Sequence, residues 1–150
     1  MSAVRKLYDD VVMDHIKNAR NYRVLPGATR SAEGVNPLCG DSFQVYVRIE
    51  GESISEVSFQ CECCGISMAS ASIMTQAIKG KSVANARRAI RDFSSMIAGQ
   101  RAAQPESESA DALAILGVVR DFPSRLNCAW LAWVTLEAAL DGRPQAVLGA

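Results

Sequence analysis

The sequence predicts an α+β fold in which a small antiparallel sheet of about three strands carries helices on one face. Residues 42–50 and 54–63 alternate apolar with polar side chains, the pattern of half-buried strands. Helical periodicity precedes and follows these two segments. The 150 residues, 49% of them hydrophobic and 21% charged, suit one compact globular domain, 1–150.

The first half of the chain is expected to hold a helix, a long loop and a hairpin. Over residues 4–18, apolar residues recur at helical spacing with charged residues between them, which indicates an amphipathic helix. Residues 19–41 contain two prolines and three glycines, so a long loop is predicted there, with a short edge strand over 22–25. The two alternating segments then pair as an antiparallel hairpin across the turn "GES".

The second half is expected to be mainly helical. From Cys64 onward the hydrophobic period changes, and residues 65–81 form a helix whose many small side chains predict a close approach to another backbone. A further helix is predicted over 82–99, followed by a polar surface excursion over 100–112. The strongly apolar segment 124–140 is the final helix.

Charge and composition exclude several classes of function. Lys plus Arg equals Asp plus Glu, at 16 each, so there is no global basic field to hold nucleic acid or an anionic membrane. No run approaches the ~18 apolar residues that span a bilayer, and charges interrupt the N-terminal stretch, so a cytoplasmic protein is expected. Five cysteines, an odd number, favour metal or sulfur chemistry over a disulfide framework.

Three of the cysteines occupy positions that suit reactive thiolates. Cys39 lies in the loop motif "NPLCGD" with Asp41 two residues later, Cys64 lies where a strand gives way to a helix, and Cys128 lies near the start of the last helix. Helix N-termini favour the thiolate form. Three sulfurs and one oxygen would suit tetrahedral zinc or part of an iron–sulfur ligand set. The alternative is that these cysteines are small buried hydrophobic residues.

Four motifs carry a family resemblance that covers almost the whole chain. "NPLCGD", "CGISMASASIMTQAIKGK" and "FPSRLNCAWLAWVTLEAAL" resemble the three cysteine motifs of the NifU N-terminal/IscU family of iron–sulfur cluster assembly proteins. "LYDDVVMDHIKNARNYRVL" is similar to the family's opening helix and loop. The long segment between the second and third cysteine motifs, about 98–120, resembles an insertion of the SufU branch.

The resemblance implies a metal site and a sulfur-carrying activity. In the SufU branch, zinc is held by three cysteines and one aspartate, which correspond here to Cys39, Asp41, Cys64 and Cys128. Cys39 would accept persulfide sulfur from a cysteine desulfurase and pass it to downstream cluster-assembly proteins, as a zinc-dependent sulfurtransferase does. Two alternatives stay open: an IscU-like scaffold that binds iron and assembles a [2Fe–2S] cluster on the same cysteines, and a structural zinc domain that acts as an interaction module.

The chain departs from the family pattern at two places. Asn127 stands where the family has a basic residue, and Arg125 is a candidate to supply that charge instead. Cys61 and Cys63 stand where the family has glycine. They are interpreted either as small neighbours of a tightly packed site or as a spare thiol relay or alternative ligand. A Cys61–Cys63 disulfide is not expected, because residues two apart on one strand face are seldom well placed to bond.

Overall fold

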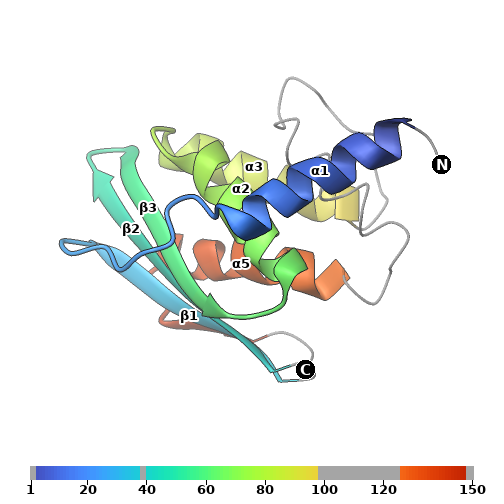
Figure 1. The fold of residues 1–150 in the computed structure, drawn as a ribbon. Coiled ribbons are helices and arrows are strands. Elements are labelled where there is room, and N and C mark those ends of the chain that lie inside the picture. The colour runs from blue at the N-terminus through green and yellow to red at the C-terminus, as the bar shows by residue number, and fades with distance from the viewer. Residues whose placement is uncertain (1–2, 38–39, 98–125, 148–150) are drawn as a thin grey trace.

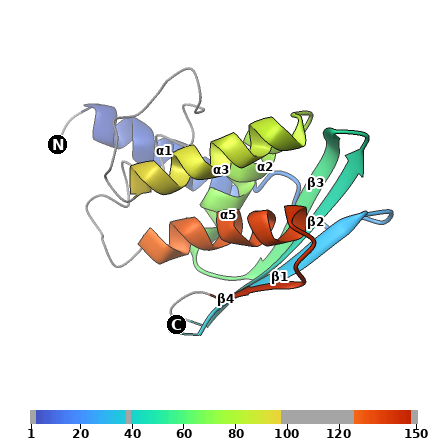
Figure 2. The same ribbon diagram turned by 180° about the vertical axis from the view of Figure 1, so that it is seen from behind.

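The computed structural model describes residues 3–37, 40–97 and 126–147 as a four-stranded sheet with helices packed on one face (Figures 1 and 2). The predicted α+β class is therefore confirmed. The helices are α1 (Ala3–Lys17), α2 (Gly65–Ile78), α3 (Val83–Ile97) and α5 (Leu126–Leu140), and the strands are β1 (Arg30–Asn36), β2 (Asp41–Glu50), β3 (Ser53–Glu62) and β4 (Gln145–Val147).

The sheet has the strand order β3-β2-β1-β4. The predicted hairpin is confirmed, since β2 and β3 pair antiparallel with Val45 opposite Phe59. Strand β1 also pairs antiparallel with β2, whereas the short β4 runs parallel to β1 and makes the sheet mixed. Strand β4 was not foreseen because three residues are too few to show an alternating pattern.

Two expectations for the segment between α1 and β2 are wrong. Strand β1 lies inside the predicted loop, because "RSAEGVN" is strand-like only through its pairing with β2 and its contact with α5. The edge strand expected over 22–25 is reduced to an isolated bridge between Tyr22 and Phe59. Tertiary pairing outweighs local propensity at both places.

The core lies between the sheet and the helices. Phe43, Val45 and Val47 of β2 are fully or almost fully buried, while the residues between them are half-buried on the other face. Helix α5 crosses the sheet so closely at β1 that a Cβ atom on Gly34 would overlap the side chain of Thr135. Gly34 is therefore required by the packing of α5 against the sheet.

Helices α2 and α5 are joined by buried hydrogen bonds of small residues. The hydroxyl of Ser70 donates to the carbonyl of Ala129 at 2.6 Å, and the indole Nε1–H of Trp133 donates to the Ser70 hydroxyl at 3.0 Å. On the other side of α2, Ser72 Oγ lies 2.7 Å from His15 Nδ1 of α1. The close approach that the small residues of α2 predicted is confirmed.

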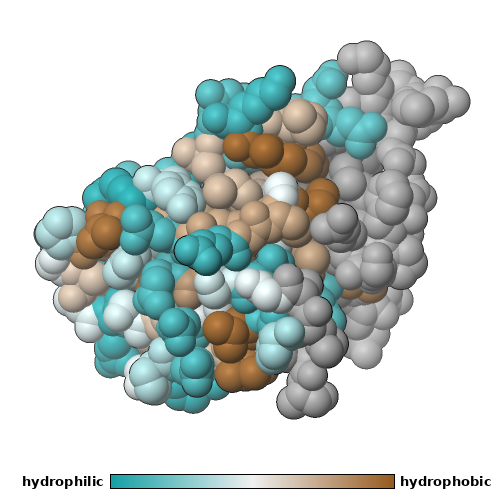
Figure 3. Space-filling model, turned by 60° about the horizontal axis from the view of Figure 1, so that its bottom comes forward, coloured by the Kyte–Doolittle hydropathy of each residue, from teal (hydrophilic) through white to brown (hydrophobic). Residues whose placement is uncertain are grey.

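The surface gives no sign of a membrane-embedded helix in the described part of the chain. None of the described helices is long and apolar enough to cross a bilayer. On the face shown in Figure 3, the most hydrophobic residues lie in several separate groups among hydrophilic ones. The insertion expected over 98–120 lies outside the described residues.

Replacing Gly34 with alanine should lower the free energy of unfolding by about 2 kcal/mol, because the added methyl group overpacks the contact with Thr135. Denaturant titration measures the loss. A Gly34→Ala/Thr135→Ala double variant, compared with Thr135→Ala alone, should recover part of it, because the overlapping side-chain atoms are gone. An unchanged cost of Gly34→Ala in that background would contradict this account of the packing.

Candidate metal centre

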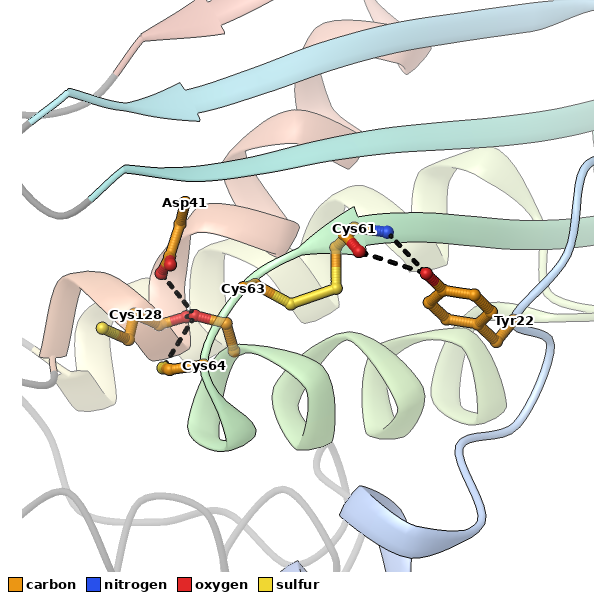
Figure 4. Close-up of a disulfide and its surroundings, with 7 residues drawn as sticks. Tyr22, Asp41, Cys61, Cys63, Cys64 and Cys128 are labelled. Carbon is orange, nitrogen blue, oxygen red and sulfur yellow. Dashed lines mark hydrogen bonds between the residues drawn. A yellow bond between two sulfur atoms is a disulfide. The ribbon is translucent and has the colours of Figure 1, made fainter.

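Asp41, Cys64 and Cys128 lie close together in the fold, and these three residues are called here the Asp–Cys–Cys group (Figure 4). One ligand atom from each lies within 4.8 Å of the other two. Asp41 and Cys128 are buried, and Cys64 is half-buried. The group comes from three separate segments, as the sequence predicted. The fourth predicted ligand, Cys39, and the auxiliary candidate Arg125 lie outside the described residues.

Asp41 is placed by the connection between β1 and β2. It is the first residue of β2 and pairs with Asn36, the last residue of β1. The backbone N–H of Gly40 donates to the Asn36 carbonyl at 2.9 Å, and Gly40 has a φ of 77°, a left-handed conformation that glycine adopts without a steric cost. The turn therefore aims the Asp41 carboxylate at the helical layer instead of at solvent.

The two thiols of the Asp–Cys–Cys group lie at the N-terminal ends of two helices. Cys64 is the N-cap residue of α2. Gly65 follows it in close contact with α1, where an added Cβ would meet Ile16 at 3.0 Å. Cys128 lies in the first turn of α5. Both sulfurs are thus near the positive ends of helices, which favour a negative charge.

Ser67 is a residue of this site that the sequence analysis missed. Its hydroxyl oxygen lies 2.9 Å from Asp41 Oδ2, 3.0 Å from the Cys128 carbonyl oxygen and 3.4 Å from Cys64 Sγ. A hydroxyl has one hydrogen to donate but rotates freely, so the Ser67 hydroxyl can donate to the Cys64 thiolate or to either oxygen, one at a time. The available signal was its spacing, because residues three apart on a helix share one face.

The charges of the Asp–Cys–Cys group favour a bound cation. Burial raises the pKa of the Cys64 thiol, but hydrogen bonds from the Ser67 hydroxyl, the Ser67 backbone and the Cys128 thiol together bring that pKa below its ordinary value. The neighbouring Asp41 carboxylate opposes this by raising the pKa of Cys64. Two thiolates and a carboxylate this close repel one another unless a positive charge lies between them.

The donor set fits zinc. Thiolate sulfur and carboxylate oxygen are both zinc ligands, and zinc–thiolate bonds place two sulfurs roughly 3.8 Å apart in a tetrahedral site. The donor atoms of the Asp–Cys–Cys group, all within 4.8 Å of one another, are already close to that spacing. Three donors leave one tetrahedral position for a further ligand.

The structure contradicts the expectation for Cys61 and Cys63. Their sulfurs form a disulfide, with the two Cα atoms 5.6 Å apart (Figure 4). The expectation was wrong because it placed both residues on one strand face, whereas β3 ends at Glu62 and Cys63 lies in the connection to α2. In this state neither sulfur is available as an alternative metal ligand. Asn127, in the first turn of α5, is exposed.

The three cysteine segments and the fold they share match a known family model. The model of the NifU-like N terminal domain matches residues 7–142. This chain belongs to that family. The resemblance inferred from the motifs is confirmed, and the Asp–Cys–Cys group lies within the matched region of this NifU-like chain.

Two relatives and a solved structure are similar over most of the NifU-like chain. The zinc-dependent sulfurtransferase SufU of Bacillus subtilis is 41% identical over 131 residues, which are 87% of each protein. The iron–sulfur cluster assembly scaffold protein IscU of Streptococcus pyogenes is 38% identical over 141 residues, covering 93% of this chain and 86% of that protein. A proposed SUF-system scaffold protein from Fervidobacterium islandicum is 29% identical and superimposes with a TM-score of 0.81 over 91% of this chain and 98% of its own.

Replacing Ser67 with alanine in the metal-free protein should raise the pKa of Cys64, because the lost hydroxyl contact stabilises the thiolate. The pH dependence of iodoacetamide alkylation at Cys64, followed by peptide mass spectrometry, measures the shift. Ser72→Ala is the matched control, since that hydroxyl lies further along α2 and contacts His15 of α1. An alkylation midpoint that does not move in Ser67→Ala would refute this role of the hydroxyl.

Proposed function

We propose that this protein is an iron–sulfur cluster assembly protein of the SufU type, which accepts persulfide sulfur at Cys39 from a cysteine desulfurase and passes it on. The observation that carries the proposal is the convergence of Asp41, Cys64 and Cys128 into one largely buried group of anionic donors. The SufU relative, whose name records a zinc-dependent sulfurtransferase, supports the same conclusion.

We assign the metal site to Cys39, Asp41, Cys64 and Cys128, with zinc as the metal. Zinc, when bound, keeps the cysteines deprotonated at neutral pH and adds no redox chemistry of its own. Asp41 and Cys128 are buried against the helices, and Ser67 contacts both of them, so they are suited to stay in place. Cys64 is held at the start of α2 beside Ser67. We therefore assign Cys39, on the connection between β1 and β2, as the thiolate that meets the partner.

The sulfur transfer is a thiol exchange. The Cys39 thiolate attacks the outer sulfur of the desulfurase persulfide, the bond between that sulfur and the partner's cysteine breaks, and the partner's cysteine leaves as a thiolate. Cys39 then carries the persulfide, and no electrons are gained or lost overall. Downstream cluster-assembly proteins are the proposed receivers of this sulfur.

A second candidate function is supported by the IscU relative and by the donor chemistry. Thiolates with one further ligand also hold [2Fe–2S] clusters, and the Streptococcus pyogenes relative is named as a scaffold. As a scaffold, the protein would assemble a cluster on the same cysteines. Purified protein that is colourless and holds tightly bound zinc favours the carrier, whereas brown protein with visible absorbance favours the scaffold.

Incubation with a cysteine desulfurase and isotopically labelled cysteine should add one labelled sulfur per chain to the wild type and none to Cys39→Ser. Intact-mass analysis under non-reducing conditions measures the addition. The Cys61→Gly/Cys63→Gly variant removes both thiols of the disulfide outside the Asp–Cys–Cys group and is the control, which should still gain sulfur. Equal gain by the wild type and Cys39→Ser would exclude Cys39 as the acceptor.

Replacing Cys128 with serine should weaken zinc binding by at least about 100-fold. Loss of a residue that only hydrogen-bonds a metal ligand already costs up to about 100-fold in affinity, and loss of the ligand itself should cost more. Chelator competition measures the affinity. Cys61→Ser serves as the control and should bind zinc as the wild type does. Unchanged zinc affinity in Cys128→Ser would remove this residue from the ligand set.

A further inference from the structure

The cysteine pair of residues 61 and 63 lies directly beside the Asp–Cys–Cys group. Cys63 precedes Cys64 in the chain, so their Cα atoms are separated by a single peptide unit, about 3.8 Å. In the view of Figure 4 the disulfide lies between Tyr22 on one side and the Asp–Cys–Cys group on the other. A bonded pair of sulfurs is thus placed next to the site that we assign to sulfur transfer.

The disulfide is poorly suited to a purely structural role. A cross-link stabilises a fold by restricting the unfolded chain, and its effect grows with the length of the loop that it closes. The Cys61–Cys63 bond encloses a single residue, Glu62. In reducing compartments, moreover, disulfides are usually transient and catalytic. The pair is therefore better explained by chemistry than by stability.

The two cysteines differ in how the fold holds them. Cys61 belongs to the edge strand β3, and the Tyr22 hydroxyl donates to its carbonyl at 3.1 Å and accepts from its N–H at 3.4 Å. Cys63 lies between the end of β3 and the start of α2, outside the strand ladder. Cys61 is thus anchored, whereas Cys63 is held by neither a strand nor a helix.

A pocket lies at the end of β3 that carries Cys61. This pocket of about 380 Å³ is lined by Cys61 together with Tyr22, Gln44, Gln60, Glu62 and other residues at the ends of β2 and β3. Its lining is mainly polar side chains, so water, sulfide ion and a small hydrophilic thiol can all be solvated there. Cys61 and Cys63 are themselves only half-buried, so a small reductant can reach the disulfide.

We propose that Cys61 and Cys63 form a dithiol that reduces the persulfide delivered to this site and releases its sulfur as sulfide. This inference rests on the proposed function for the delivery of sulfur, but its chemistry belongs to the pair itself. The sulfur of a persulfide must gain two electrons to become sulfide, and two thiols that form one disulfide supply two electrons.

The reaction balances in two exchanges. The Cys63 thiolate first attacks the outer sulfur of the delivered persulfide, so that Cys63 carries the persulfide and the donor cysteine leaves as a thiolate. The Cys61 thiolate then attacks the Cys63 sulfur, the bond to the outer sulfur breaks, and hydrosulfide leaves as the Cys61–Cys63 disulfide forms. The bonded pair is the product of this second step. An external dithiol reduces the disulfide for the next turnover.

Single-turnover sulfide release tests the proposal. Zinc-loaded protein is reduced, freed of reductant without oxygen, and mixed with one equivalent of glutathione persulfide, which bypasses the desulfurase. We expect about one sulfide per chain and a new Cys61–Cys63 disulfide in the peptide map. Cys61→Ser and Cys63→Ser should each release sulfide at least about tenfold more slowly. Cys61→Ser should also accumulate persulfide on Cys63, which a structural disulfide would not explain.

Two controls keep the outcome decisive. The Cys61→Gly/Cys63→Gly variant restores the residues common in the family, so it remains informative if a serine variant folds poorly, and it too should lose sulfide release. Release at the wild-type rate by these variants, or release from the wild type without the Cys61–Cys63 disulfide, would overturn the proposal. A parallel experiment with desulfurase and cysteine separates the proposed function from this inference. If sulfide is released from glutathione persulfide but not with the desulfurase, only the proposed delivery of sulfur through Cys39 is rejected.

Discussion

The contact between the N-terminal halves of α2 and α5 is the constraint on which the metal centre depends. Ser70 and Trp133 lock the two helices together through buried hydrogen bonds, and one turn earlier Ser67 reaches the Cys128 carbonyl. Because these contacts lie at the helix starts, they bring the two thiols to the same place. A larger side chain in place of Ser67 or Ser70 would push the helices apart and separate the sulfurs.

The charge of the centre follows from this packing. Helix starts and the Ser67 hydroxyl favour thiolate at Cys64, while the buried Asp41 carboxylate adds a third negative group. Such a concentration of negative charge with little water to screen it is unstable alone and becomes stable around a cation. The proposed metal binding and the proposed sulfur transfer thus rest on one feature, the enforced proximity of anionic donors.

The extra cysteines distinguish the segment before Cys64 from the family pattern. In a chain with glycine at both positions, the segment before Cys64 offers backbone only. Here the same segment holds two sulfurs that bond to each other one residue away from a predicted ligand. The change needs no rearrangement of the fold, because Cys61 keeps its place opposite Phe43 in the β2–β3 ladder and Cys63 lies in the connection to α2.

Local patterns in the sequence by themselves determined the helices, the β2–β3 hairpin and the candidate ligands, since periodicity and thiol position are properties of short segments. The family motifs joined Asp41, Cys64 and Cys128 before their distances were known. Only the tertiary structure decided that 30–36 is a strand, that Ser67 contacts the group and that Cys61 bonds Cys63. Each of these features depends on a distant partner residue or on a bend in the chain. Hydrophobic periodicity encodes neither, so these features become visible only in the folded arrangement.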